Sequence, residues 1–324
     1  MEDHKNHSFI SNFKLQGFLY HVCLFFLPVL FLYIGLELKL RDLPSEPKVK
    51  NEYLVENRKD IKILVLGASQ TQRSINPEYL DKTAINLGNS SQGIYENLQL
   101  LKAFEPKLPN LELVILGLPF NSVHSLQNFT RQEIHHYNLI IYGVNTFGRK
   151  IKPQDYLLFH TNPDFFSRRL LDHYKNESPI QLNKYGFDIN KIYGSYQSAD
   201  YDTTLIDKKD IVIENFKNKQ ALKENSKLLS EFFSYCRNNN IEVLLYSSPT
   251  HFLYNELRDK AMIRERDSLV KKFGKNFPFI KFFNEEENKS FTANYYYNAN
   301  HLNPKGAKKA TIRLNEFIFN NYDF

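Results

Sequence analysis

The feature that most constrains the fold is a short apolar run that ends in two small residues and a serine. Residues 61–66 read Ile-Lys-Ile-Leu-Val-Leu, which is typical of a buried parallel strand. Gly67-Ala68 follows and lets the chain turn sharply into a polar segment with helical potential. Because open α/β folds bind ligands at the carboxyl ends of their parallel strands, we expect Ser69 at that edge of a sheet. Ser69 is then either a nucleophile or an ordinary helix-capping serine.

A histidine near the other end of the chain lies in a turn and not on an apolar face. Residues 298–303 read Asn-Ala-Asn-His-Leu-Asn, and Pro304 follows them. Asn303 can cap a helix, and proline suits the first position of that helix. His301 is therefore expected in a loop just before the last helix, which makes it a candidate base for Ser69.

Together, the strand–Gly-Ala-Ser turn and the late histidine resemble the SGNH (GDSL-type) hydrolase family. The resemblance covers roughly residues 60–123 and 235–320. It implies a flavodoxin-like three-layer α/β sandwich in which Ser69 is the nucleophile and His301 is the base.

The family's last block reads Asp-x-x-His, whereas this chain has Asn298 at the aspartate position. Asn298 could orient the imidazole but supplies no counter-charge. The glutamates at 285–287 are an alternative source of a carboxylate for this third role.

Two further family blocks are matched in part. Residues 84–92 resemble the second block, and by spacing the family's oxyanion glycine falls near Ser91, with Gly88 as the other option. In the third block Pro119 occupies the family's asparagine position, and Asn121 lies two residues on. The oxyanion donors implied by the resemblance are the backbone N–H groups of Ser69 and of Ser91 or Gly88, and the side-chain amide of Asn121.

Two other residues are candidate substrate contacts. Arg73 lies one helical turn beyond Ser69 and either binds an anionic substrate or pairs with a nearby carboxylate; we favour the structural role. His251 follows a strand predicted over residues 241–248, so it is a rival base or a substrate contact. The spacing of His135-His136 does not fit a metal site, and two cysteines form no ligand pattern. No metal or other cofactor is expected.

The rest of the chain alternates strand and helix patterns, which predicts about five mostly parallel strands with helices on both faces. Strands are expected over 61–66, 83–87, 111–116, 241–248 and 277–283, and helices over 95–104, 221–238, 255–273 and 304–320. Between about 122 and 220 the pattern loosens into aromatic and charged segments. That length is too great for one loop, so we predict a largely helical insertion within a domain over 60–324.

The N-terminal region contains an apolar run long enough to cross a bilayer. Residues 17–36 read GFLYHVCLFFLPVLFLYIGL, and no small-x-small cleavage site follows. We therefore predict a signal anchor over 15–37, between a tail over 1–14 and a linker over 38–59. The alternative is a buried helix of the globular domain.

The side of the membrane on which the large domain lies is predicted differently by two signals. More basic residues follow the span than precede it, which by the positive-inside rule keeps the domain in the cytoplasm. The resemblance is nearest to the membrane-anchored branch that includes the D-alanyl-transfer protein of teichoic acid systems and the alginate O-acetylation proteins. That branch implies a bacterial protein with an extracytoplasmic domain, in the periplasm or at the cell surface, and we adopt this prediction.

Composition and charge argue against two classes of protein, disordered chains and nucleic-acid-binding proteins. The chain is 42% hydrophobic and 24% charged, as in ordinary folded proteins. Its net charge of +6 includes no basic block of the kind that binds nucleic acid.

The resemblance implies an ester hydrolase or acyltransferase that acts on acylated cell-envelope glycan or lipid. The alternative is a weakened SGNH-like module that binds polymer or partners a membrane-bound O-acyltransferase; Asn298 and the missing third-block asparagine favour it.

Overall fold

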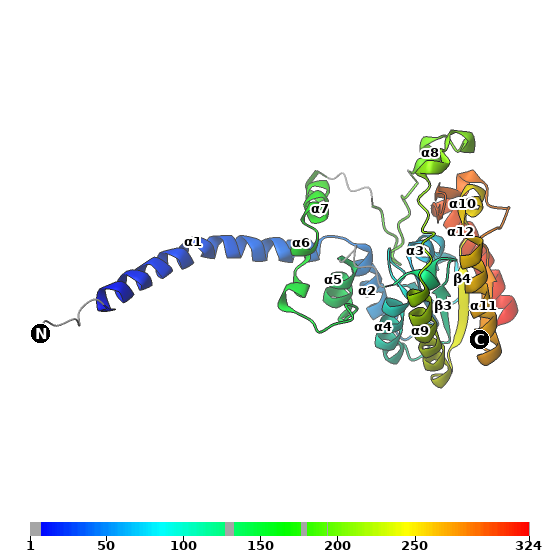
Figure 1. Ribbon diagram of the computed structural model, residues 1–324, viewed down its shortest axis with the longest axis horizontal. Coiled ribbons are helices and arrows are strands. Elements are labelled where there is room, and N and C mark those ends of the chain that lie inside the picture. The colour runs from blue at the N-terminus through cyan, green and yellow to red at the C-terminus, as the bar shows by residue number, and fades with distance from the viewer. Residues whose placement is uncertain (1–7, 127–132, 176–179, 193, 324) are drawn as a thin grey trace, which may run out of the picture.

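The core of the molecule is a five-stranded parallel sheet with the strand order β2-β1-β3-β4-β5 (Figure 1). The computed structural model describes residues 8–126, 133–175, 180–192 and 194–323. The strands are β1 (Ile63–Leu66), β2 (Ala84–Asn86), β3 (Leu113–Gly117), β4 (Glu242–Ser247) and β5 (Ile280–Asn284). The α/β prediction is confirmed, and the strand order is that of flavodoxin-like folds.

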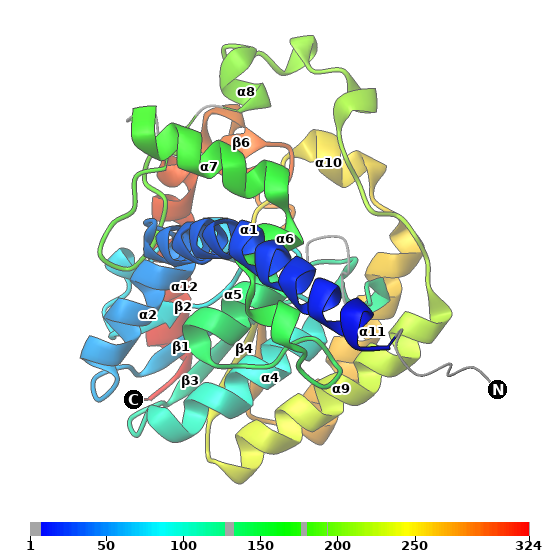
Figure 2. The same ribbon diagram turned by 90° about the vertical axis from the view of Figure 1, so that its left-hand side faces the viewer.

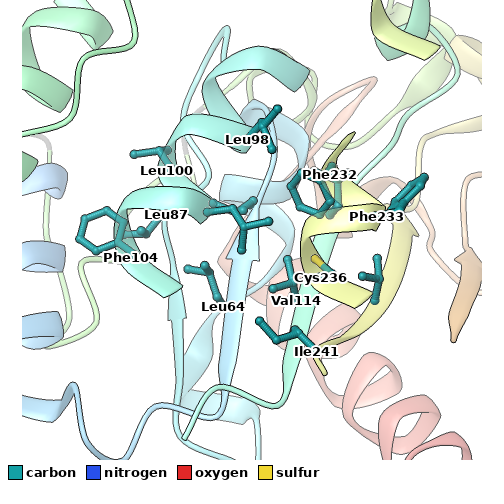
Figure 3. Packing of buried hydrophobic residues seen from close by; sticks show 14 of the residues in the cluster. Leu64, Leu87, Leu98, Leu100, Phe104, Val114, Phe232, Phe233, Cys236 and Ile241 are labelled. Atoms are coloured by element: carbon teal, nitrogen blue, oxygen red, sulfur yellow. The ribbon is translucent and has the colours of Figure 1, made fainter. Parts of the chain in front are cut away.

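Helices cover both faces of this sheet and make three layers. The main ones are α4 (Ile94–Phe104), α9 (Lys219–Asn238) and α12 (Pro304–Asn321). On one face Leu64 and Val114 pack with side chains of α4 and α9 (Figure 3). On the other face Ile63 and Ile115 pack with side chains of α12. Because successive strand residues point to opposite faces and both faces are covered, the central strands are continuous apolar runs.

The helix predicted over residues 255–273 is two helices, α10 (Phe252–Leu257) and α11 (Lys260–Asn276). The break lies at Asp259, whose carboxylate accepts hydrogen bonds from the backbone N–H groups of Ala261 and Met262 and so caps a new helix.

The segment around His301 is more regular than the predicted loop. It forms an antiparallel pair, β6 (Tyr296–Asn298) and β7 (His301–Leu302), directly before α12. Asn303 caps α12 through the N–H of Gly306 at 2.9 Å, as predicted. Short 3₁₀ turns lie at η1 (Pro77–Tyr79), η2 (Glu105–Lys107), η3 (Ser122–His124), η4 (Pro153–Tyr156), η5 (Thr203–Leu205), η6 (Lys208–Asp210) and η7 (Ala293–Tyr295).

The N-terminal helix α1 (Ser8–Asp42) projects away from the rest of the molecule (Figure 1). Its portion Leu15–Asp42 has a mean hydropathy of 2.2 over its most apolar window, none of which is buried. The helix is therefore long and apolar enough to cross a membrane.

The predicted linker is instead a packed helix, α2 (Glu46–Asn57). Ser45 caps it, and Tyr53 and Leu54 enter the main core. The buried ammonium group of Lys50 donates to the carbonyl of Gly88 at 3.1 Å. α2 therefore supports the loop that follows β2.

The insertion has two different halves. The first half is helical and contains α5 (Glu133–Tyr142), α6 (Leu158–Thr161) and α7 (Pro163–Lys175). We call the whole segment over 133–175 the collar. The second half, from 180 to 218, consists mostly of turns and extended segments around the short helix α8 (Ser195–Ser198). The prediction of a largely helical insertion is thus correct for the first half alone.

Candidate active site

Ser69 is the first residue of α3 (Ser69–Ser74), immediately beyond β1. Ala68 occupies the N-cap position, so the helix-capping interpretation of Ser69 is wrong. Gly67 has φ 151°, and a Cβ at this position would lie 2.5 Å from the hydroxyl of Thr71. Gly117, at the end of β3, abuts the same side chain. These two glycines let α3 approach the ends of β1 and β3, and they place Ser69 at the carboxyl edge of the sheet.

Ser69, His301 and Asn298 form a hydrogen-bonded chain. Nε2 of His301 lies 2.8 Å from the hydroxyl oxygen of Ser69, and Nδ1 lies 2.9 Å from the side-chain oxygen of Asn298. That oxygen also accepts the backbone N–H groups of His301 at 3.0 Å and Asn300 at 3.2 Å. Because the group facing Nδ1 is an acceptor, the proton of the neutral imidazole is assigned to Nδ1. The lone pair on Nε2 then faces the serine hydroxyl.

The three glutamates considered as a substitute carboxylate all pair elsewhere. Glu285 accepts from Arg313 at 2.7 Å, and Glu287 accepts from Arg258 at 2.5 Å. Glu286 is buried between two arginines, Arg258 and Arg266. Asn298 contacts Nδ1 of His301, so the chain has an amide where a triad aspartate would lie.

The serine opens into a cavity of about 750 Å³. Ser69, Ser91, Asn121, Asn298 and His301 all line this cavity. The structure thus brings together residues from the first block, both intermediate blocks and the last block of the sequence. A reacting ester could meet the serine, the imidazole and several hydrogen-bond donors in the same space.

Of the two backbone positions considered for the oxyanion, the structure favours Ser91 over Gly88. Ser91 lines the cavity and has φ 64°, a left-handed conformation that glycine adopts most readily. Gly88 does not line the cavity, and its N–H donates to the side-chain oxygen of Asn86 at 2.9 Å. The prediction of Gly88 as a donor is therefore corrected.

The Asn121 side chain is held by a residue of the insertion. Its amide nitrogen donates to a carboxylate oxygen of Glu214 at 3.1 Å. An amide nitrogen carries two N–H groups, so one stays available after this bond is formed.

Arg73 and His251 do not belong to the serine cavity. The Arg73 guanidinium stacks 4.7 Å over the ring of Tyr297 and lines a separate, smaller cavity of about 240 Å³. Burial lowers the pKa of Arg73. His251 is buried, binds the hydroxyl of Tyr196 at 2.8 Å through Nδ1, and is the N-cap of α10. Burial lowers its pKa to about 4. Neither residue lines the serine cavity, so the structure does not bring Arg73 or His251 to a substrate bound at Ser69, and His251 is not a rival base.

One wall of the cavity comes from an extended segment over residues 211–218, which we call the strap. Its alternate side chains Val212, Glu214, Phe216 and Asn218 line the cavity. The intervening Asn215 points to the α10–α11 junction, where its side chain donates to the carbonyl of Leu257 at 2.6 Å and accepts the N–H of Asp259 at 2.9 Å. Among the described residues that line the cavity, Glu214 has the single carboxylate, and none is lysine or arginine.

A buried ionic network holds the loop that carries Asn121. Glu286 accepts the backbone N–H of Phe120 at 3.1 Å, and Arg266 donates to the carbonyl of Leu118 at 3.2 Å. Arg266 and Glu286 bond one another with two contacts of 3.0 Å. Sequence reasoning missed this network and the strap because their members lie far apart in the chain and form no local motif.

No group of three or more His, Cys, Asp or Glu side chains that could hold a metal ion occurs in the described part of the chain. His135 and His136 are buried in α5, where His135 Nδ1 lies 3.0 Å from the hydroxyl of Thr146.

Comparison with solved structures finds similar proteins from bacteria. A candidate platelet activating factor from Streptococcus pneumonia is 12% identical, with 90% of this chain and 98% of that chain covered and a TM-score of 0.41. A candidate acylhydrolase from Bacteroides fragilis is 10% identical, with 83% and 94% covered and a TM-score of 0.40. A GDSL-like lipase from Bacteroides thetaiotaomicron is 11% identical, with 85% and 99% covered and a TM-score of 0.39. Identities and TM-scores this low do not indicate which reaction this chain catalyses. No family model matches the sequence, and no curated protein matches it.

Proposed function

We propose that this chain is a membrane-anchored serine ester hydrolase or acyltransferase of the SGNH type. The observation that carries the proposal is the chain of hydrogen bonds from Ser69 to His301 to Asn298 at the wall of one cavity. A serine becomes a useful nucleophile when a base accepts its proton, and the base is effective when a third group orients it.

In the proposed reaction the hydroxyl oxygen of Ser69 attacks the ester carbonyl while Nε2 of His301 takes the hydroxyl proton. The tetrahedral intermediate collapses to an acyl-serine as the imidazolium returns the proton to the leaving alcohol. Water or a second hydroxyl then attacks the acyl-serine by the same steps in reverse. Asn298 keeps the proton on Nδ1 throughout and so keeps Nε2 free to act.

The negative oxygen of the intermediate needs donors placed in advance. We assign this role to the backbone N–H groups of Ser69 and Ser91 and to the second N–H of the Asn121 amide. A donor of this kind contributes about 3 kcal/mol to lowering the barrier. The left-handed backbone at Ser91 supports this assignment, because strained residues are found where function requires them.

The substrate we propose is an acylated glycan or lipid of the cell envelope. Support comes from the membrane-spanning length of α1 and from a cavity lined with amide and hydroxyl groups, such as those of Asn97, Asn218 and Ser122. Such groups bind sugar hydroxyls well.

The test uses the full chain in detergent and a fluorophosphonate probe, which labels activated serines. Wild type should be labelled, and peptide mapping should place the label on Ser69; Ser69→Ala should not be labelled. His301→Ala should lose turnover of a short-chain aryl ester by about a thousandfold or more while its melting temperature stays within a few degrees of wild type. Near-normal turnover in either variant would remove that residue from the mechanism.

For the topology we propose that α1 anchors the chain and that the large domain lies outside the cytoplasm. Carbonate extraction should leave the protein in the membrane fraction. A reporter fused after Phe324 should be active on the outer side; activity confined to the cytoplasm would contradict this orientation.

The second candidate is a non-catalytic module that binds polymer or partners a membrane-bound O-acyltransferase. It is favoured by the amide at Asn298 and by the carboxylate of Glu214, which places a negative charge beside a proposed oxyanion donor. Absence of both probe labelling and esterase turnover in a folded wild type would select this function.

A further inference from the structure

The collar packs around the end of the N-terminal helix α1 and around Leu43, the residue that follows it. Leu40 and Leu43 are each 3% exposed and pack against Leu158 and Phe166 of the collar. The carboxylate of Glu37 is also buried, and it accepts the first backbone N–H groups of α6 at 2.8 and 2.9 Å. This carboxylate caps α6 from another helix, so α1 is joined to the collar by buried hydrogen bonds as well as by apolar packing.

The contacts place the collar at the level where a membrane span would end. Phe159 of α6 packs edge-on against Tyr33 of α1, with ring centroids 6.4 Å apart. Tyr33 lies within the apolar run over 17–36. At 1.5 Å per residue, α1 rises only about 8 Å from Glu37 to its last residue, Asp42, and Leu43 follows directly. The polar layer on each side of a bilayer is about 5–8 Å thick. The collar therefore cannot lie clear of this layer if α1 spans the membrane.

The collar surface that surrounds α1 has the residue types of a membrane interface. Helix α7 runs across the direction of α1, and in the view along α1 it lies beside that helix (Figures 1 and 2). Its outer stripe includes Leu171, which is 57% exposed, and Tyr174, which is 69% exposed. The ammonium group of Lys39 lies 5.8 Å from the ring centroid of Tyr174, which places this ring beside α1. Exposed aromatic and aliphatic side chains next to lysine are typical of residues at the headgroup level.

Basic residues accompany this apolar stripe. Arg168 and Lys175 lie on the exposed side of α7, and an exposed run over 150–152 reads Lys-Ile-Lys. Its Ile151 is 40% exposed. Basic side chains near a bilayer surface each contribute about 1 kcal/mol to binding anionic lipid. Such a combination of apolar and basic residues is what amphipathic interfacial helices use.

We propose that the collar lies in the headgroup layer of a bilayer that contains anionic lipid, with Leu171 and Tyr174 inserted and Arg168 and Lys175 on the headgroups. The rigid joint at Glu37 then holds the serine cavity at a constant height above the membrane. This inference rests on the proposal that α1 spans the membrane, and it is independent of the reaction at Ser69.

The chain contains no tryptophan, so a single introduced tryptophan reports one position. The test reconstitutes the full chain into vesicles of phosphatidylglycerol and phosphatidylcholine whose acyl chains carry bromine, which quenches nearby tryptophan. Leu171→Trp is the test position, and Tyr174→Trp repeats it. Leu24→Trp, in the exposed part of α1, is the positive control; Phe319→Trp, which replaces a 79% exposed residue of α12, is the negative control.

We expect Leu171→Trp and Tyr174→Trp to show blue-shifted emission that bromine quenches by about twofold or more, whereas Phe319→Trp stays unquenched. Quenching at Leu24→Trp with none at the two collar positions would overturn the proposal while leaving the anchor intact. No quenching at Leu24→Trp would overturn the anchor and this proposal together. Vesicles of phosphatidylcholine alone should lower quenching at Leu171→Trp and leave Leu24→Trp unchanged; equal quenching in both lipids would exclude a role for anionic headgroups.

Discussion

At the residue scale, Asn298 sets how strongly the imidazole of His301 can hold a proton. Its side-chain oxygen accepts two backbone N–H groups as well as Nδ1 of His301. All three partners are donors, so an aspartate would keep every contact and add a negative charge. That charge would stabilise the imidazolium formed as Ser69 attacks.

We therefore predict that Asn298→Asp raises kcat for an aryl ester by about tenfold or more, which corresponds to about 1.4 kcal/mol of barrier. KM should change little, because the gain arises as charge develops on the histidine. The measurement compares wild type, Asn298→Asp and Asn298→Ala, with the alanine variant expected to fall below wild type. A folded Asn298→Asp enzyme with no gain in kcat would mean that the imidazole charge does not limit the rate.

Glu214 is the other residue whose charge should have a measurable effect on the reaction rate. Its carboxylate is the single one among the described residues of the cavity wall, and it holds the Asn121 amide. We predict that Glu214→Gln raises kcat/KM for an anionic ester several-fold relative to a neutral ester, because a like charge is removed at short range. The control is Glu256→Gln, on α10, whose carboxylate pairs with Lys208 outside the cavity. The same selectivity ratio in wild type and Glu214→Gln would show that this carboxylate does not face the substrate.

The residues that were predictable from the sequence are those that carry a local signal. Ser69 follows a strand and two small residues, and His301 precedes a proline-started helix, so each position could be assigned without a partner. Glu214 carries no such signal, because the strap has no helix or strand pattern. Its role follows from the attachment of Asn215 to the α10–α11 junction, a contact between segments more than 40 residues apart.

At the element scale, the start of α4 contains a carboxylate with an unusual environment. Glu96 is fully buried and accepts the backbone N–H of Gly93 at 2.9 Å. Burial raises its pKa to about 7 from a usual 4.5. Between these values the folded chain binds a proton that the unfolded chain has released, so stability from this group is present at low pH and is lost as pH rises through 7.

We predict that Glu96→Gln removes the loss of stability that accompanies ionisation of the Glu96 carboxyl, because glutamine stays neutral and keeps the oxygen that caps α4. Between pH 4.5 and pH 8 the free energy of unfolding of wild type should fall relative to that of Glu96→Gln by about 3 kcal/mol, since one pKa unit is 1.36 kcal/mol. Denaturant titrations at the two pH values measure it, with Glu231→Gln, at an exposed ion pair, as the control. A parallel pH dependence in wild type and Glu96→Gln would contradict the raised pKa.

The elements were predicted well where one pattern decided them and poorly where two patterns competed. The strands around Leu64 and Val114 are apolar runs with both faces buried, and no other element fits them. For α2 the prolines at 44 and 47 suggested a linker. Ser45 followed by Pro47 is equally a helix start, and the structure shows that cap. Burial of Tyr53 and Leu54 in the main core decides between the two, and a sequence does not display that tertiary contact.

At the scale of the whole molecule, α1 is more than a tether, since Leu40 in its last turn and Leu43 directly after it complete the apolar core of the collar. Leu40 and Leu43 would each leave an apolar gap against Leu158 and Phe166 if the helix were removed. Burial of a leucine side chain contributes about 1.5–3 kcal/mol. The two side chains together therefore contribute about 3–6 kcal/mol to the collar. The central sheet receives none of this contribution, because its clusters contain no residue of α1.

We therefore predict that two truncated chains differ in the collar and agree in the sheet. A chain over 45–324 lacks Glu37, Leu40 and Leu43, whereas a chain over 33–324 keeps them. In detergent, trypsin should cut after Arg168 or Arg169 in α7 at least about tenfold faster in the shorter chain, because about 1.4 kcal/mol of lost stability raises the open population tenfold. Fluorophosphonate labelling of Ser69 should proceed at similar rates in both, since Ser69 lies on α3 and His301 on β7, and the apolar cluster of the collar contains no residue of either element. Equal cleavage rates in α7 would mean that the collar is stable without α1, and the rigid connection between membrane helix and domain would then have to come from α2 alone.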